Sequence, residues 1–297
     1  MRILTSRTAK VLFAQAWLVG LSAGAGHCWA NAAINIQMTG WNADVIYQSN
    51  YPGDVVQGFD GDGNGSYSWV ENGTYGPENV INGLSVNNNV TSAITDPYTK
   101  ANTQFQFQPY NGNNELKLGS SAVPGQTLTL ATPAGYNNLA ILAASGNIGG
   151  DATSTFTLTF SDGSTSGPIT YDPYDWGGGT SQKVFTGLVR SESGTESYAS
   201  LTVSSASYNM YETDINLTTL TSSDGAADSA KFIKTITFAV PSGGRIGVFA
   251  ISGVQNTSAA DPLPESSTIS LLAAAAVPLL FRRRAGRWMH RGHKTAR

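Results

Sequence analysis

Three stretches of the chain alternate apolar and polar residues with a period of two, and this pattern constrains the fold more than any other feature. They are residues 103–108 (TQFQFQ), 126–130 (QTLTL) and 154–160 (STFTLTF). Successive side chains of a β-strand point to opposite faces, so such a run predicts a strand with one buried and one solvated face. We therefore expect half-buried antiparallel strands rather than helices.

Further short apolar runs extend this pattern, and turns rich in Gly, Pro, Asp and Ser separate them. The runs are residues 44–48, 138–144, 201–205, 215–219, 232–240 and 245–252, with turn signals at 123–125, 161–164 and 241–244. Many short strands with such turns favour an all-β fold. We predict one antiparallel β-sandwich of jelly-roll type over residues 31–255, flanked by an N-terminal signal helix and a C-terminal hydrophobic helix.

The start of the chain has the composition of a secretory signal peptide. Three basic residues lie in the first ten positions, and the apolar stretch 11–25 is too short for a comfortable membrane span. We expect a signal peptide over residues 1–30, with cleavage after Ala30. A lipoprotein signal at Cys28 is the weaker alternative, because the bulky His27 precedes it.

The C-terminal segment has three parts in a fixed order: a short polar motif, an apolar stretch and a basic cluster. They are Pro264-Glu265-Ser266, residues 268–281, and Arg282-Arg283-Arg284. As a helix, the apolar part would span about 21 Å, less than the roughly 30 Å hydrocarbon core. It therefore suits a transient membrane arrest, with the arginines on the cytoplasmic side.

This segment resembles the PEP-CTERM sorting domain of Gram-negative bacterial exoproteins. The resemblance implies a linker with the Pro-Glu-Ser motif at 256–265 and a sorting helix with a basic tail at 266–297. It also implies recognition by an exosortase-type membrane protease and transient insertion into the inner membrane. The destination would be the cell surface or the exopolysaccharide matrix outside the cell.

The charge of the chain is strongly partitioned. Of the 17 Lys and Arg residues only seven lie between 31 and 265, whereas all 20 Asp and Glu residues lie there, giving that part a net charge of −13. Such an acidic body is unsuited to binding nucleic acid through phosphates. All three His residues and the single Cys lie outside it, which excludes from the body a Ser-His-Asp triad, a Cys nucleophile and a His/Cys zinc site.

The sharpest local motif runs from residue 60 to residue 71 (DGDGNGSYSWVE). It matches the twelve-residue calcium loop, in which oxygen ligands alternate along the chain and a glycine permits the sharp turn. The candidate ligands are Asp60, Asp62, Asn64 and Glu71. No amphipathic helix flanks the loop, so a turn whose exposed carboxylates bind nothing is the alternative.

Aromatic residues in or beside turns are candidate sugar-stacking groups, and packing against the core is the alternative for each of them. They are Trp41, Tyr67, Trp69, Tyr171, Tyr174 and Trp176. The loop 171–176 (YDPYDW) is favoured, with Tyr171, Tyr174, Asp175 and Trp176 as ligand-binding residues.

Residues 135–143, 160–164 and 175–176 loosely resemble galactose-binding-like β-sandwich modules of secreted bacterial proteins. That resemblance implies a carbohydrate-binding or accessory fold.

These features predict an exported cell-surface or extracellular-matrix protein with a non-catalytic structural or adhesive role. A carbohydrate-binding module, with calcium as a candidate cofactor, is the alternative. A glycan-active enzyme with paired carboxylates is a third hypothesis, for which Asp44, Asp162, Asp172 and Asp175 are the candidates.

Overall fold

The computed structural model describes the greater part of the predicted sandwich. The described residues are 33–49, 51, 54–62, 66–75, 79–119, 126–147, 153–179, 182–192, 208–239, 241 and 243–259. They all belong to one compact unit within Asn31–Arg297. The predicted signal peptide, the Pro-Glu-Ser motif and the sorting tail lie outside the described residues.

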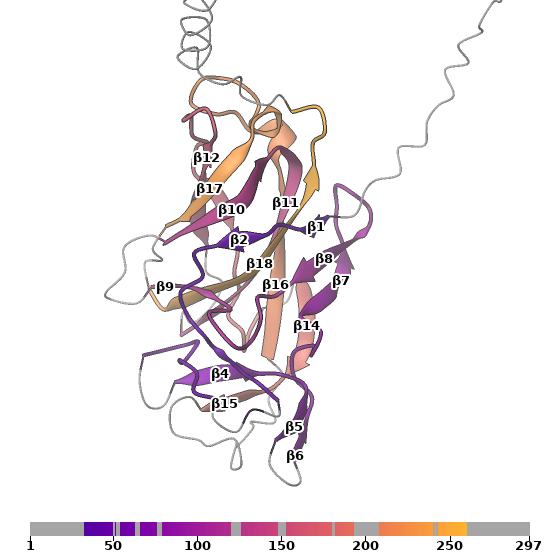
Figure 1. Cartoon of the computed structure of the whole chain (residues 1–297), viewed down its shortest axis with the longest axis vertical. Coiled ribbons are helices and arrows are strands. Elements are labelled where there is room, and N and C mark those ends of the chain that lie inside the picture. The colour runs from indigo at the N-terminus through magenta and orange to yellow at the C-terminus, as the bar shows by residue number, and fades with distance from the viewer. Residues whose placement is uncertain are drawn as a thin grey trace, which may run out of the picture. The chain divides into compact units, whose positions relative to one another are not determined.

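A central antiparallel sheet organises the fold, with strand order β1-β18-β11-β16-β14 (Figure 1). Its members are β1 (Ile34–Asn35), β18 (Arg245–Gln255), β11 (Tyr136–Gly146), β16 (Tyr208–Asn216) and β14 (Lys183–Leu188), and β9 (Leu116–Leu118) also pairs with β18. The two long strands β11 and β18 are buried along almost their whole length. Apolar residues occupy both alternating sets of positions in these two strands, so both faces of the sheet can be covered there.

A second antiparallel sheet has the order β13-β12-β17-β10-β2. Its strands are β13 (Ile169–Tyr171), β12 (Ser154–Phe160), β17 (Ile233–Phe238), β10 (Gln126–Ala134) and β2 (Met38–Thr39). Threonines occupy its outer face, where the hydroxyls of Thr127 and Thr237 on neighbouring strands lie 2.9 Å apart. The alternating residues of β12 and β17 point inward, as the period-two pattern predicts.

The two sheets share one hydrophobic core, which we call the first core. Leu139 and Ile141 of β11 meet Phe156 of β12 and Ile236 and Phe238 of β17 in it. The protein is therefore an all-β structure in which two antiparallel sheets pack face to face.

A third layer covers the other face of the central sheet and encloses a second core. Ala140 and Leu142, which alternate with the first-core residues of β11, pack there with Phe249 of β18, Trp69 of β4 and Phe105 of β8. The layer consists of the sheet β15-β4-β3 and the hairpin β7-β8, with β5-β6 nearby (Figure 1). The bounds are β3 (Ile46–Tyr47), β4 (Tyr67–Val70), β5 (Gly73–Tyr75), β6 (Asn79–Ile81), β7 (Asn89–Thr95), β8 (Asn102–Gln106) and β15 (Arg190–Glu192). The pair β3-β4 is parallel.

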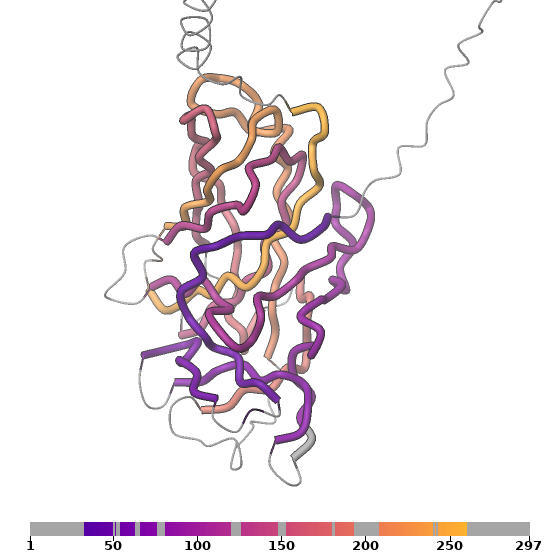
Figure 2. Tube along the Cα trace, in the orientation of Figure 1, coloured from indigo at the N-terminus to yellow at the C-terminus, as the bar shows by residue number. Residues whose placement is uncertain are grey.

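The N-terminal part of the described chain joins the two sheets of the sandwich. β1 pairs with β18 in the central sheet, and β2 pairs with β10 in the second sheet. The chain crosses from the central sheet to the second sheet at Ile36 and Gln37. This crossing lies in the indigo segment of Figure 2. This crossing places polar side chains at an edge of the sandwich.

One strand prediction is wrong. Residues 217–219, within the expected strand 215–219, form the 3-10 helix η2 (Leu217–Thr219), because the Asn216 side chain accepts a hydrogen bond from the backbone N–H of Thr218 at 3.0 Å. A second short 3-10 helix, η3 (Asp228–Ala230), follows. The expected strand 201–205 lies outside the described residues.

Candidate functional site

The predicted calcium loop is described at Asp60, Asp62 and Glu71, whereas Asn64 lies outside the described residues. The three carboxylates have different partners. Asp60 accepts a hydrogen bond from the backbone N–H of Tyr67 at 2.6 Å, and Glu71 accepts from the backbone N–H and the hydroxyl of Ser49 at 2.6 and 2.9 Å. Across the described residues, no group of three acidic, His or Cys side chains is arranged to hold a metal ion.

A cation of the protein itself lies against this loop. The ammonium group of Lys117 donates to the carbonyl oxygens of Gly58 and Gly61 at 2.5 and 2.8 Å, and to Asp62 at 3.0 Å. Its hydrogen bond holds the pKa of the Asp62 carboxyl below the usual range. Hard oxygen ligands of this kind would otherwise suit calcium. The arrangement favours the structural turn, and the calcium site stays a prediction.

The favoured aromatic loop is divided between the two cores. Tyr171 is fully buried in the first core, where its ring contacts Phe156 and Phe238. Trp176 is buried in the second core, beside Phe59 and Trp69. Core packing, the alternative for each ring, therefore describes both of them.

The other two residues of that loop are only half-buried. The Tyr174 ring contacts Tyr211, and the Asp175 carboxylate accepts a hydrogen bond from the backbone N–H of Gly177 at 2.8 Å. The structure does not gather the four predicted ligand-binding residues on one surface, so a shared sugar site in this loop stays a prediction.

The remaining predicted aromatics also make internal contacts. The Trp41 indole donates to the carbonyl of Met38 at 3.1 Å, and Trp69 is fully buried. The guanidinium of Arg190 lies 3.8 Å from the centre of the Tyr67 ring and 4.4 and 5.1 Å from the rings of Tyr208 and Trp176. These rings therefore surround a cation of the protein.

The four candidate carboxylates have different surroundings. Asp162 is paired with Lys231 at 2.5 Å, whereas Asp172 and Asp175 are half-buried in the loop after β13. Asp44 lines an open pocket, which we call the acidic pocket. Its volume is about 540 Å³, and it is lined by Asp44, Gln48, Tyr51, Asp54, Val55 and Asn111.

Two neighbouring carboxyls give this pocket its character. Asp44 accepts a hydrogen bond from the Asn114 amide at 2.6 Å, and Asp54 accepts from the backbone N–H of Gln48 at 2.6 Å. Burial raises the pKa of Asp44 to about 6, and the nearby Asp54 contributes to this rise. Burial likewise raises the pKa of Asp54.

An exposed aromatic ring completes the acidic pocket. Tyr51 is 54% exposed, in contrast to the buried rings of Tyr171 and Trp176. Sequence reasoning found Asp44 but missed Tyr51, Asp54 and Asn111. The Pro-Gly pair that follows Tyr51 in the sequence is a turn signal, and it was the available indication of this site.

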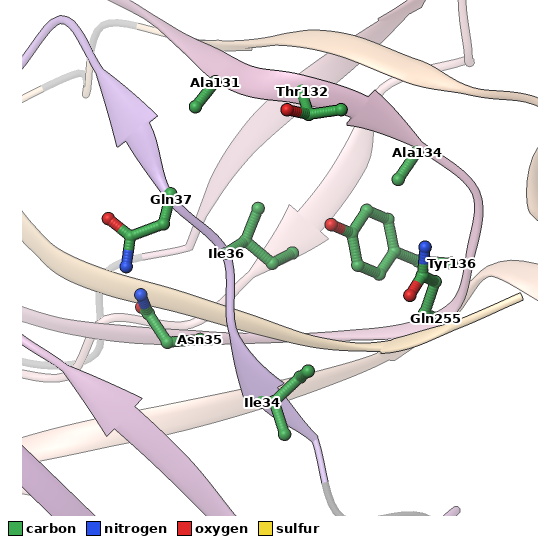
Figure 3. A pocket seen from close by; sticks show the side chains of 9 residues that line it. All are labelled: Ile34, Asn35, Ile36, Gln37, Ala131, Thr132, Ala134, Tyr136 and Gln255. Carbon is green, nitrogen blue, oxygen red and sulfur yellow. The ribbon is translucent and has the colours of Figure 1, made fainter.

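A second cavity lies where the chain crosses from β1 to β2, and we call it the uncharged pocket (Figure 3). Its volume is about 240 Å³. Its apolar lining is Ile34, Ile36, Ala131, Ala134 and Tyr136, and its polar lining is Asn35, Gln37, Thr132 and Gln255. No Asp, Glu, Lys or Arg is among these described lining residues.

The fold is all-β, and two open pockets lie at its surface, one lined by two carboxyls and one without charged side chains among the described residues. The sequence matches no protein-family model, and no curated protein is similar enough to count as a relative. Along the described ranges, no helix is both long and apolar enough to span a membrane.

Proposed function

We propose that this protein is an exported, non-catalytic adhesive protein of the cell surface or extracellular matrix, and that it binds carbohydrate through the acidic pocket. The observation that carries the proposal is the exposed Tyr51 ring beside Asp44, Asp54 and Asn111 in an open cavity of about 540 Å³. An aromatic face can stack on a sugar ring, while carboxyl and amide groups bond its hydroxyls. The volume falls within the range of about 300–1,000 Å³ typical of ligand sites.

The chemistry of the pocket favours a polyhydroxylated ligand over an apolar one. Asp44 accepts hydrogen bonds from Asn114 and from the backbone of Ile46, and Asp54 accepts from the backbones of Gln48 and Val55. An ionised carboxylate has about four lone-pair sites, so acceptor capacity remains on each. The amides of Gln48 and Asn111 add donors and acceptors at the rim. An exopolysaccharide of the surrounding matrix is the proposed partner.

Binding assays on the purified protein test this function. We expect signals on a glycan array, and we expect Tyr51→Ala and Asp44→Asn each to weaken binding of the best glycan by about tenfold, or ~1.4 kcal/mol. Tyr98→Ala is the matched control, because Tyr98 is also an exposed tyrosine, at 46%, but does not line the pocket. Equal binding by Tyr51→Ala and the unaltered protein would exclude the acidic pocket as the site.

The route to the surface belongs to the same proposal. The sequence supports a jelly-roll domain at 31–255 that is exported by its signal peptide and sorted through the PEP-CTERM-like tail. An exosortase-type protease would then remove the segment after the Pro-Glu-Ser motif. Mass spectrometry of the secreted protein tests this step, and an intact C-terminus at Arg297 would rule it out.

One observation favours a second candidate function, a glycan-active enzyme. Asp44, with a pKa raised to about 6 next to Asp54, has the property of a general acid in a carboxylate pair. A glycosidase would release reducing ends from the glycan that binds best, and Asp44→Asn would abolish that release. Binding without release would leave the non-catalytic function.

A further inference from the structure

The uncharged pocket is lined by a tyrosine whose hydroxyl opens into it. Tyr136 as a whole is 8% exposed, but its hydroxyl is not one of the fully buried side-chain atoms that lack a partner among the described residues. In Figure 3 this hydroxyl points into the pocket, toward Ile36. A hydroxyl that opens into a pocket can donate one hydrogen bond to a ligand and accept others in place of water.

The Tyr136 ring packs closely against the central sheet. At Gly253 of β18 an added Cβ would lie 2.7 Å from Cδ1 of Tyr136 and 2.9 Å from the carbonyl oxygen of Asn138. Only glycine allows the ring to approach the strand so closely. The ring is therefore a preformed wall of the pocket, which lowers the cost of ordering it on binding.

Two amide side chains of the pocket are held by a third. The side-chain nitrogens of Asn35 and Gln37 both donate to the Gln106 side-chain oxygen of β8, at 3.3 and 3.0 Å. Figure 3 shows these two amides next to each other on one side of the pocket. Because their nitrogens are directed to Gln106, their oxygens are left as acceptors for hydroxyl groups. Gln255 and Thr132 add further polar groups.

The size and the charge of the pocket further restrict the class of ligand that it can bind. The volume of about 240 Å³ lies below the roughly 300–1,000 Å³ of sites for drug-sized molecules, which suits one ring rather than an extended chain. The described lining has no carboxylate, although the body around it carries a net charge of −13. An anionic sugar would find no cationic partner there, and a cationic one would find no anionic partner.

We propose that the uncharged pocket binds a single neutral sugar unit, such as a chain end or a side branch of a polysaccharide. Tyr136 would supply an aromatic wall and a hydroxyl, and Asn35 and Gln37 would accept hydrogen bonds from the sugar. This inference rests on the proposed carbohydrate-binding function and adds a second site to it. Two sites on one domain would raise the avidity for a polymer that reaches both.

Nuclear magnetic resonance titration of the isotope-labelled protein tests the proposal. The probes are methyl glucoside, methyl galactoside, glucuronic acid and cyclohexanol, each added to about 50 mM, well above the millimolar affinities that weak sites show. We expect at least one neutral glycoside to shift the signals of Gln37, Ala131 and Gln255, with weaker effects of glucuronic acid and cyclohexanol. No shift with any glycoside, or equal binding of cyclohexanol, would overturn the proposal.

Two variants separate this site from the acidic pocket. Tyr136→Phe retains the ring and removes the hydroxyl, so we expect it to weaken glycoside binding about three- to tenfold. Tyr51→Ala should leave these signals unchanged. Shifts confined to the acidic pocket would refute the uncharged site and leave the proposed function standing. Shifts confined to the uncharged pocket would refute binding through the acidic pocket and leave the uncharged site standing.

A stability measurement distinguishes a binding role of the hydroxyl from a structural one. Because the Tyr136 hydroxyl opens into the pocket, Tyr136→Phe should be at least as stable as the unaltered protein in urea without sugar. A clear loss of stability would mean that the hydroxyl is bonded within the protein, which would overturn its assignment to a ligand.

Discussion

The ammonium group of Lys117 lies 3.0 Å from a carboxylate oxygen of Asp62, inside the loop whose sequence matches a calcium site. The Lys117 side chain is only 8% exposed, and two backbone carbonyls also accept its hydrogen bonds. The second oxygen of Asp62 accepts from Arg245 at 2.6 Å. The negative charge at this position of the loop is therefore already compensated by two basic side chains.

The first prediction removes this internal cation. Lys117→Met keeps an apolar stem of similar length but leaves the carbonyls of Gly58 and Gly61 without this donor, so we expect a loss of about 2–4 kcal/mol. Urea unfolding measures it. Lys234→Met is the control, because Lys234 is exposed, and it should change stability by less than about 0.5 kcal/mol. Equal stability of the two variants would contradict a structural role for Lys117.

The second prediction concerns a glycine under a buried carboxyl. A Cβ at Gly247 would lie 2.0 Å from Oε1 of Glu115 and 2.8 Å from the Phe59 ring. Glu115 is fully buried and cannot turn into solvent, so Gly247→Ala should cost about 1–3 kcal/mol by overpacking. Gly167→Ala, where nothing lies within 4 Å of an added Cβ, should be near neutral in the same thermal unfolding experiment.

The third prediction is a pH dependence that arises from Asp214. Burial and the neighbouring Glu212 raise the pKa of Asp214 to about 8, so between about pH 4 and 8 the folded state binds a proton that the unfolded state has released. Stability due to this group is therefore full below pH 4 and is lost as the pH rises through 8. Asp214→Asn should remove that loss and gain about 1–2 kcal/mol at pH 8, a value reduced to allow for partial solvent screening.

The control for Asp214 is Asp224, whose contribution to stability is expected to change with pH in the opposite direction. Hydrogen bonds from Lys231 and Ser222 lower the pKa of Asp224, so its contribution to stability is present above the ordinary aspartate pKa and fades in acid. Asp224→Asn should therefore be less stable than the unaltered protein at neutral pH, and this difference should shrink in acid. If urea unfolding between pH 3 and 9 gave both variants the same pH trend, the assignment to Asp214 would be wrong.

The fourth prediction tests the cation among the aromatic rings. Arg190→Lys keeps the positive charge but loses the flat guanidinium that lies over Tyr67 and Tyr208, which should cost about 1–2 kcal/mol. The near-ultraviolet circular dichroism of Trp176, whose ring is also nearby, should change as well. Arg245→Lys, at a guanidinium that bonds Asp62 and has no described ring contact, should leave that spectrum unaltered.

Local alternation predicted much of the second sheet. The run 154–160 became β12 with the same bounds, and 126–130 lies in β10. Prediction was poorer for β16, where Glu212 and Asp214 interrupt the apolar pattern although the strand pairs with β11 and β14. A polar residue in a strand sequence is expected to face solvent. Glu212 is instead buried, because the β7-β8 hairpin lies over it and the Ser92 hydroxyl of β7 donates a hydrogen bond to its carboxylate.

The candidate sites were harder to predict than the strands. Asp44 and Asn111 are far apart in sequence, yet they line one pocket. Tyr171 and Trp176 are near neighbours in sequence, yet they enter different cores. Large rings gain more from burial than from exposure at a turn, so proximity in sequence was a poor guide to a shared surface.

The sequence by itself determined that this is an all-β chain with an acidic body, because residue alternation and charge are local properties that each segment carries wherever it packs. Tertiary structure alone decided that the central sheet is covered on both faces and that Lys117 lies in the predicted calcium loop. It also decided that Tyr136 presents its hydroxyl to a pocket between β1 and β2. These outcomes depend on which distant strands meet, and pairing between distant segments is set by burial of the whole core rather than by any one stretch of residues.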